Sequence, residues 1–322
     1  MMQEWDVEAQ SPLYNIGSVA RLTGVSTGTL RNWEARYGVP TSIRIAPNGH
    51  RLYTQAEAAL TRVLAERVAA GTPIRKAAAA VASERRTPVV LAAALRHAAL
   101  RLDDATARRV VAEAAAVLPP DRMWREVAAP TLHDLGERWA ATGEGIAAEH
   151  LVTEVIRGSL HAALVARRAD GVAPLVVVAC GPGERHELGS LMLTLLLRDH
   201  GVHAVYLGAD TPPSALAEAG TLPGTRVLVV TTMTLPSAWR TAEALIELSA
   251  QTRDDTTAAR LAYSGPGFAG AAPIHDLLRG QALYVGGGLD AVVVTCAALA
   301  RDQWSPPTGH APWSGEAPFS AL

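Results

Sequence analysis

Cysteine is scarce in this chain of 322 residues, and long apolar runs are missing. Cys180 and Cys296 are the only cysteines, and two thiols form neither a metal cage nor a disulfide framework. No run approaches the roughly 18 uninterrupted apolar residues of a transmembrane helix, so we expect no membrane association. Met1 to Ser11 has acids but no apolar core, so we expect no secretion signal and a reducing, cytoplasmic location.

Charge is unevenly distributed along the sequence. The net charge is −2, yet residues 14–81 contain nine basic and three acidic residues, which leaves the rest of the chain acidic. A basic N-terminal module is typical of proteins that bind a phosphate backbone. A chain of this length exceeds one core of ordinary size, which predicts two or three domains.

The apolar pattern of residues 14–81 predicts a winged helix-turn-helix. A first amphipathic helix ends at Gly24, and Ser26 is a typical N-cap for the second helix. The pattern then indicates a wing strand over 50–53 and a further helix over about 55–70.

The rest of the chain predicts two more domains and a tail. Residues 82–88 are polar and indicate a linker, and residues 89–168 have the periodicity of about four bundled helices. Residues 174–302 alternate β-rich runs with amphipathic segments, which is typical of a Rossmann-like parallel sheet. The tail over 303–322 is rich in proline, glycine and serine and is expected to be disordered. We expect strands at 175–180, 204–207, 226–231, 260–263 and 282–285, and helices at about 188–200, 212–219, 236–250, 268–279 and 289–301. The predicted fold class is therefore multidomain, α and α/β.

Two segments resemble the MerR family of regulators. They are the stretch from Tyr14 to Gly38 and the wing signature Asn48-Gly-His-Arg-Leu-Tyr53. The resemblance implies double-stranded promoter DNA as a partner, with the second helix in the major groove. Donors on that helix suit base edges and phosphates, although arginines on a solvated helix face would look the same. The candidate DNA contacts are Thr27, Arg31, Asn32 and Arg36 on the helix and His50, Arg51 and Tyr53 on the wing, where Tyr53 also supports the wing.

The segment Glu184-Arg-His186-Glu-Leu-Gly189 resembles the E/D-x-H-x-x-G motif of cobalamin-binding domains. The resemblance implies that His186 is the lower axial ligand of cobalt. A carboxylate two residues earlier suits the other ring N–H, and glycine leaves room for the nucleotide tail. The motif follows a parallel strand, where open α/β sheets bind ligands.

Further positions match the same family. Gly208 and Asp210 lie in the segment after the second strand. Where the family has Ser-x-Leu and Gly-Gly along the nucleotide-tail channel, this chain has Thr231-Thr232-Met233 and Ser264-Gly265. Threonine keeps the hydroxyl and serine is small, so Thr232, Ser264 and Gly265 are candidate cofactor residues.

In the predicted bundle, Trp139 is followed after nine residues by Glu149 and His150. This spacing resembles the W-x9-E-H motif of CarH/LitR-type photoreceptor regulators. The resemblance implies adenosylcobalamin held between bundle and α/β domain, with Trp139 against the adenosyl group, and a homo-oligomer (dimer or tetramer). In that family a histidine directly after the tryptophan takes the upper cobalt position after illumination. Here the residue is Ala140, and His133, two turns earlier, is a poor substitute.

These features predict a cobalamin-dependent, light-responsive transcriptional repressor and not an enzyme. Because of Ala140, the chain could also sense cobalamin without a locked light state, or hold another tetrapyrrole. One alternative function is a corrinoid carrier that delivers methyl groups. Another is a regulator whose cobalamin-like fold binds a partner protein.

Overall fold

The computed structural model describes residues 14–41, 44–45, 49–167, 175–253, 255 and 257–302. The chain divides between Val155 and Ile156 into two units. Asn48 of the wing signature and the tail 303–322, predicted to be disordered, lie outside the described residues. Within the described part, no helix combines the length and the hydropathy needed to cross a membrane.

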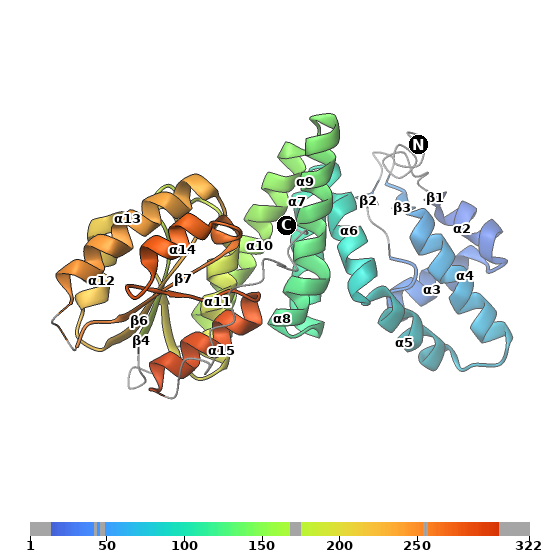
Figure 1. The fold of residues 1–322 in the computed structure, drawn as a ribbon. Coiled ribbons are helices and arrows are strands. Elements are labelled where there is room, and N and C mark those ends of the chain that lie inside the picture. The colour runs from blue at the N-terminus through green and yellow to red at the C-terminus, as the bar shows by residue number, and fades with distance from the viewer. Residues whose placement is uncertain are drawn as a thin grey trace. The chain divides into compact units, whose positions relative to one another are not determined.

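The N-terminal elements form a winged helix-turn-helix (Figure 1). The hydroxyl of Ser26 accepts a hydrogen bond from Thr29 N and begins the second helix, as predicted. Gly24 and Gly38 end the two helices in the left-handed conformation that glycine adopts without strain. The elements are β1 (Tyr14–Asn15), α2 (Ile16–Thr23), α3 (Thr27–Tyr37), β2 (Arg44–Ile45), β3 (Arg51–Tyr53), α4 (Gln55–Ala69) and α5 (Ile74–Arg85).

The wing is a small antiparallel sheet in the order β1-β3-β2. Tyr14 pairs with Tyr53, and Arg44 pairs with Leu52, so β3 connects the wing to the start of the helix-turn-helix. Apolar side chains from the helices and from β3 fill one core beneath it: Val19, Leu30, Trp33, Val39, Tyr53, Ala58, Leu64, Ala77, Ala78 and Val81.

The predicted linker over 82–88 is wrong in its extent. Helix α5 continues to Arg85, and α6 (Pro88–Leu100) begins three residues later. The basic and polar residues that indicated a linker are also good helix formers, so they extend α5. Pro88 fits the first turn of α6, where a backbone N–H has no helical partner.

A helical bundle follows the winged helix-turn-helix. Its helices are α6, α7 (Asp104–Val117), the continuous run α8 (Pro120–Met123), η1 (Trp124–Ala128) and α9 (Ala129–Thr142), and α10 (Ile146–Ala166). η1 is a π-helical turn inside that run. α9 ends at Gly143, and α10 crosses the division between the two units. Buried residues of the bundle include Leu91, Leu95, Val110, Val111, Leu135 and Val152.

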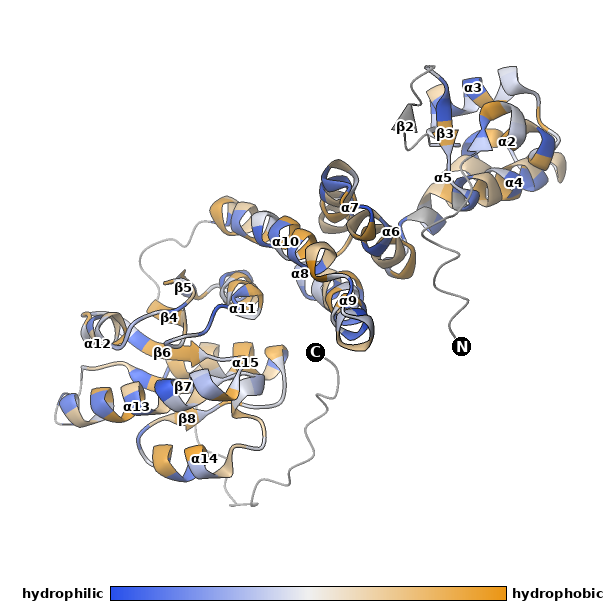
Figure 2. Cartoon of the chain, turned by 90° about the horizontal axis from the view of Figure 1, so that it is seen from above, coloured by the Kyte–Doolittle hydropathy of each residue, from blue (hydrophilic) through white to orange (hydrophobic). Residues whose placement is uncertain are grey.

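The second unit contains a five-stranded, fully parallel sheet in the order β5-β4-β6-β7-β8. Its strands are β4 (Leu175–Cys180), β5 (His203–Tyr206), β6 (Thr225–Thr231), β7 (Arg260–Ser264) and β8 (Leu283–Tyr284). Each predicted strand is present, with ends shifted by two residues at most. Figure 2 shows the central strand β6 in the orange of hydrophobic residues, as expected for a strand covered on both faces.

Helices cover both faces of this sheet (Figures 1 and 2). α11 (Leu188–Asp199) and α15 (Leu289–Ala300) pack together on one face, and α12 (Pro213–Thr221), α13 (Leu235–Gln251) and α14 (Ala272–Leu278) on the other. The helix predicted over 268–279 is shorter than expected, because a 3-10 turn, η2 (Pro266–Phe268), and Gly270 with a φ of +71° precede α14.

The chain reverses direction across the sheet between β5 and β6. From β4 it passes to β5 on one side and then to β6 on the other, so the loops after β4 and β6 diverge at the carboxyl edge. Such a switch point opens a crevice in doubly wound sheets, and ligands bind there. The loop after β4 contains Glu184 and His186.

Candidate functional site

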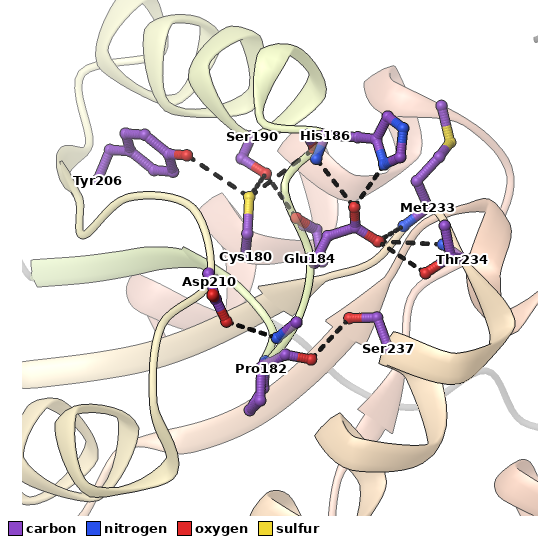
Figure 3. A network of polar contacts seen from close by, with 12 residues as sticks. Cys180, Pro182, Glu184, His186, Ser190, Tyr206, Asp210, Met233, Thr234 and Ser237 are labelled. Carbon is purple, nitrogen blue, oxygen red and sulfur yellow. Dashed lines mark hydrogen bonds and ion pairs between the residues drawn. The ribbon is translucent and has the colours of Figure 1, made fainter.

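The loop between β4 and α11 is held in place by contacts on two sides (Figure 3). Ser237 Oγ of α13 donates to the carbonyl of Pro182 at 3.0 Å, and the backbone N–H of Gly183 donates to Asp210 Oδ1 at 2.6 Å. Gly181 lies so close to α13 that a Cβ there would be 1.8 Å from Thr241 Oγ1. The loop is therefore fixed before any ligand binds.

Glu184 is the centre of this loop and its side chain is only 1% exposed. Oε1 accepts from the backbone N–H of His186 at 2.9 Å and lies 2.6 Å from His186 Nδ1. Oε2 accepts from the backbone N–H groups of Met233 and Thr234 at 2.7 and 3.0 Å and from Thr234 Oγ1 at 3.4 Å. The carboxylate thus connects the two loops that diverge at the switch point.

These contacts keep Glu184 ionised. Burial alone would raise its pKa, but the hydrogen bonds from the His186 ring and from the backbone N–H groups of His186, Met233 and Thr234 outweigh burial and lower the pKa to about 2. A carboxylate at this position holds the proton of the imidazole on Nδ1. The predicted contact between the carboxylate and the ring of His186 is present.

The His186 side chain is 60% exposed at the carboxyl edge of the sheet. With Nδ1 directed to Glu184, Nε2 is the nitrogen that suits a metal ion, and this carboxylate–histidine pairing is typical of metal-ligating imidazoles. Among the described residues there is no group of three or more His, Cys, Asp or Glu side chains that could hold a metal ion. One imidazole without a protein cage fits a metal that arrives inside a macrocycle, such as the cobalt of a corrinoid.

The surroundings of His186 leave space for such a group. A Cβ at Gly189, in the first turn of α11, would meet no atom within 4 Å, and the same holds at Gly208 after β5. Thr232, predicted as a cofactor residue, has a buried hydroxyl for which the described residues provide no hydrogen-bond partner. A bound nucleotide tail would fill the open space beside Gly189 and Gly208, whereas the Thr232 hydroxyl lies against Gly267.

Three predicted cofactor residues also hold the loops around the site. The Asp210 carboxylate accepts from Gly183 N, and Asp210 N donates to the carbonyl of Glu184 at 2.7 Å. Ser264 Oγ donates to the carbonyl of Val285 at 2.7 Å. Gly265 has a φ of +108°, and a Cβ there would be 2.2 Å from the carbonyl oxygen of Thr232. Asp210, Ser264 and the backbone at Gly265 thus hold loops together, and their contact with a cofactor stays a prediction.

A buried polar network beneath the loop has no counterpart in the sequence predictions. Cys180 Sγ lies 3.2 Å from Ser190 Oγ and 3.5 Å from Tyr206 OH (Figure 3). Ser190 Oγ lies 2.5 Å from Thr231 Oγ1. Burial raises the pKa of Cys180, so the thiol stays protonated. Tyr206 OH also donates to Glu187 Oε2 at 2.9 Å. The only sequence signal for this network is the position of Glu187 directly after the motif histidine.

The predicted bundle residues lie around the turn between α9 and α10. Trp139 is in the last turn of α9 and is 49% exposed. Glu149 and His150 are in the first turns of α10, and His150 and Ala140 are exposed. His133 Nε2 lies 3.2 Å from Glu137 Oε1 on its own helix. These residues belong to the first unit and His186 to the second.

The predicted DNA-binding residues form an exposed surface on the winged helix-turn-helix. Thr27, Arg31, Asn32 and Arg36 are exposed along α3, and His50 and Arg51 are exposed on the wing. A pocket of about 310 Å³ lies between α3 and the wing, lined by Asn15, Ile16, Arg31, Glu34, Gly49, His50, Arg51 and Tyr53.

Tyr53 is a correction to the predicted DNA contacts, because its side chain is buried in the core. Its hydroxyl donates to Glu34 Oε2 at 3.1 Å, and Arg51 NH1 donates to the same oxygen at 2.7 Å. Burial, followed by the nearby Glu34 carboxylate, raises the pKa of Tyr53 to about 12. Glu34, which the sequence predictions missed, therefore connects the second helix to the wing.

Comparison with known families finds matches in both N-terminal domains. Residues 14–84 match the MerR HTH family regulatory protein, and residues 91–164 match the B12 binding domain. Among solved structures, the chain is similar to the monomethylamine corrinoid protein of Methanosarcina barkeri, with a TM-score of 0.52 over 63% of this chain and 95% of that one. The two are 17% identical, so this likeness concerns the fold alone.

Two curated relatives match over most of their length. The HTH-type transcriptional repressor CarH of Myxococcus xanthus is 35% identical over 232 residues, 64% of this chain and 74% of that protein. The HTH-type transcriptional repressor CarA of the same organism is 33% identical over 211 residues, 63% of this chain and 71% of that protein. Together with the winged helix-turn-helix, the B12-binding match and the Glu184–His186 pair, this similarity shows that the chain belongs to the CarH and CarA family of MerR-type regulators.

Proposed function

We propose that this chain is a cobalamin-dependent, light-responsive transcriptional repressor that works in the cytoplasm. It binds promoter DNA through α3 and the wing and adenosylcobalamin through His186. The observation that carries the proposal is the buried Glu184 carboxylate, which directs His186 at the switch point of the sheet. The relatives are repressors, and the chain is a regulator rather than an enzyme.

In this proposal His186 would hold the cobalt of the cofactor. Glu184 holds the Nδ1 proton and orients the ring, so Nε2 is the nitrogen that would bind the metal. Gly189 leaves room for the nucleotide tail, and Thr232 is proposed as a cofactor residue because its hydroxyl has no hydrogen-bond partner among the described residues. When bound, adenosylcobalamin supplies a cobalt–carbon bond that light can break, and this photochemistry belongs to the cofactor.

Trp139, Glu149 and His150 are proposed to cap the upper, adenosyl side of the cofactor. The half-exposed indole of Trp139 offers an apolar surface for the adenosyl group, and a large exposed apolar side chain of this kind is typical of a binding surface. Ala140 cannot coordinate cobalt, so no ligand from this position replaces the adenosyl group after illumination. The illuminated state is therefore expected to lack a second protein ligand from the residue after Trp139.

Cofactor binding is proposed to control a homo-oligomer, a dimer or a tetramer. An oligomer presents several DNA-binding heads at once, and linked heads have a high effective concentration at a repeated operator. Loss of the adenosyl group removes its contacts with the cap and shifts this equilibrium, which releases DNA.

A spectroscopic experiment tests this proposal directly. Purified protein is mixed with adenosylcobalamin in the dark, desalted, and its visible spectrum and operator affinity are recorded before and after green light. We expect retained cofactor, a light-induced change and weaker DNA binding. His186→Ala should alter the bound spectrum, whereas His161→Ala, at an exposed position of α10, should not. If no corrinoid stays with the wild-type protein, the proposed function is wrong.

A further inference from the structure

Glu187 joins three segments of the second unit beside the candidate cofactor site. It directly follows His186 and is the N-cap residue of α11. Its Oε1 accepts from Arg157 NH1 of α10 at 3.1 Å, and its Oε2 accepts from Tyr206 OH at the end of β5 at 2.9 Å. Both carboxylate oxygens are therefore engaged, one by a helix and one by a strand.

Several observations separate Glu187 from an ordinary surface ion pair. Its side chain is only 15% exposed. In the surface ion pairs that contribute little to stability, both charged side chains are exposed to solvent. The Tyr206 hydroxyl also contacts the buried Sγ of Cys180 at 3.5 Å, and burial raises the pKa of Tyr206, so the hydroxyl remains a donor. Glu187 is thus anchored to the interior of the sheet as well as to α10.

The position of Arg157 on α10 gives this contact its significance. α10 is one continuous helix from Ile146 to Ala166, and Arg157 lies seven residues after His150, about 10 Å along the axis. The helix that contains the proposed upper-side residues Glu149 and His150 therefore also binds the residue next to the proposed lower ligand.

We propose that Glu187 is a positioning residue that fixes the His186 loop to α10 and β5, and so couples axial ligation of the cofactor to the position of α10. The inference rests on the proposed function, because it takes His186 as the cobalt ligand. It adds a residue outside the E-x-H-x-x-G motif positions.

The test uses the full chain with Glu187→Gln, which keeps the shape and an acceptor for Tyr206 but removes the charge that faces Arg157. Glu243→Gln, at an exposed position of α13, is the matched control. In the protein without cofactor, hydrogen–deuterium exchange of the loop Gly181–Glu187 should be about tenfold faster in Glu187→Gln than in the control. Thermal unfolding of the two variants should stay similar, since the change acts on one loop.

With adenosylcobalamin, Glu187→Gln should lower affinity by about tenfold, as expected for a residue that supports a metal ligand. A larger fraction of the bound cofactor should show the spectrum of a corrinoid without a lower nitrogen ligand, which a general loss of folding would not produce. Arg157→Gln should have a similar effect. The double variant should add little to either single change, because both remove the same contact.

The outcomes distinguish this inference from the proposed function. If Glu187→Gln matches Glu243→Gln in exchange, affinity and spectrum while His186→Ala loses the lower ligand, the positioning role is refuted and the proposed function stands. If wild-type protein retains no corrinoid, the proposed function fails, and with it the coupling, whatever the exchange rates show.

Discussion

Replacing Glu184 with glutamine exchanges one carboxylate oxygen for an NH2 group, and the new side chain cannot accept from all five donors that the carboxylate satisfies. The carboxylate accepts from His186 N, His186 Nδ1, Met233 N, Thr234 N and Thr234 Oγ1. Glutamine has one oxygen and one NH2 group, so its NH2 group must face either the donors of His186 or the donors of Met233 and Thr234. Either the loop after β6 or the His186 ring loses its partner.

The structure allows the cost to be calculated in two ways. A hydrogen bond to a charged group contributes about 1.5–3 kcal/mol, and at least two are lost in either orientation, which gives about 3 kcal/mol or more. Linkage gives the same order, because a carboxyl whose pKa falls from 4.5 to about 2 on folding stabilises the protein by about 3 kcal/mol at neutral pH. If the NH2 group faces Nδ1, the imidazole proton moves to Nε2, which then cannot bind cobalt.

Urea unfolding of the cofactor-free protein measures how far Glu184→Gln lowers the free energy of unfolding, with Glu218→Gln at an exposed position of α12 as control. Because the folded pKa of Glu184 is depressed, its contribution is complete above pH 4.5 and is lost as the pH falls from 4.5 towards 2. The difference between wild type and Glu184→Gln should therefore shrink over that range. Adenosylcobalamin affinity should fall by about 10- to 100-fold. Equal stability and affinity in Glu184→Gln and the control would refute the reasoning.

Three further changes test other parts of the molecule. Glu34→Ala should weaken operator binding several-fold although it removes a negative charge from the DNA-binding head, because Arg51 and Tyr53 lose their common acceptor. A gel-shift titration that shows tighter binding than Glu66→Ala would contradict this role. Gly265→Ala should destabilise the second unit by about 2 kcal/mol or more, since the new Cβ would overlap the Thr232 carbonyl at a φ of +108°. Gly189→Ala should leave unfolding unchanged and lower only cofactor affinity. Equal unfolding midpoints for the two variants would show that the approach of Gly265 to Thr232 is not tight. Trp139→Ala should weaken adenosylcobalamin binding in the dark and leave hydroxocobalamin binding unchanged, as measured by spectral titration with Trp239→Ala in α13 as control. An equal loss of affinity for both corrinoids would exclude a specific contact with the adenosyl group.

The sequence predicts the parallel sheet and the core of the site well because these depend on short-range patterns. Buried strands contain continuous apolar runs, such as 175–180 in β4 and 227–230 in β6, and a run of that kind has few other stable positions in a domain. The Glu184–His186 contact is local as well, since the partners lie two positions apart along one loop. Its position at the carboxyl edge follows from the strand that precedes it.

The contacts that the sequence predictions missed join residues far apart in the chain. Glu184 binds Met233 and Thr234 about 50 residues later, and Glu34 binds Arg51 and Tyr53 across the turn to the wing. Backbone N–H groups leave no mark on the sequence, because every residue except proline has one. The sequence predicts a DNA contact at Tyr53 for a related reason. A wing strand alternates between buried and exposed positions, and only the packed structure shows which face Tyr53 occupies.

Three predicted cofactor residues show what a motif of this kind encodes. Asp210, Ser264 and Gly265 occupy family positions, and the hydrogen bonds of the first two and the close backbone approach at Gly265 hold the loops at the carboxyl edge. A crevice at a switch point exists only while the loops on either side stay apart and in register. Glu184 performs both tasks, because one oxygen orients the metal-binding imidazole and the other binds the opposite loop. Family positions around such a site therefore specify the geometry of the loops at least as much as direct contact with the ligand.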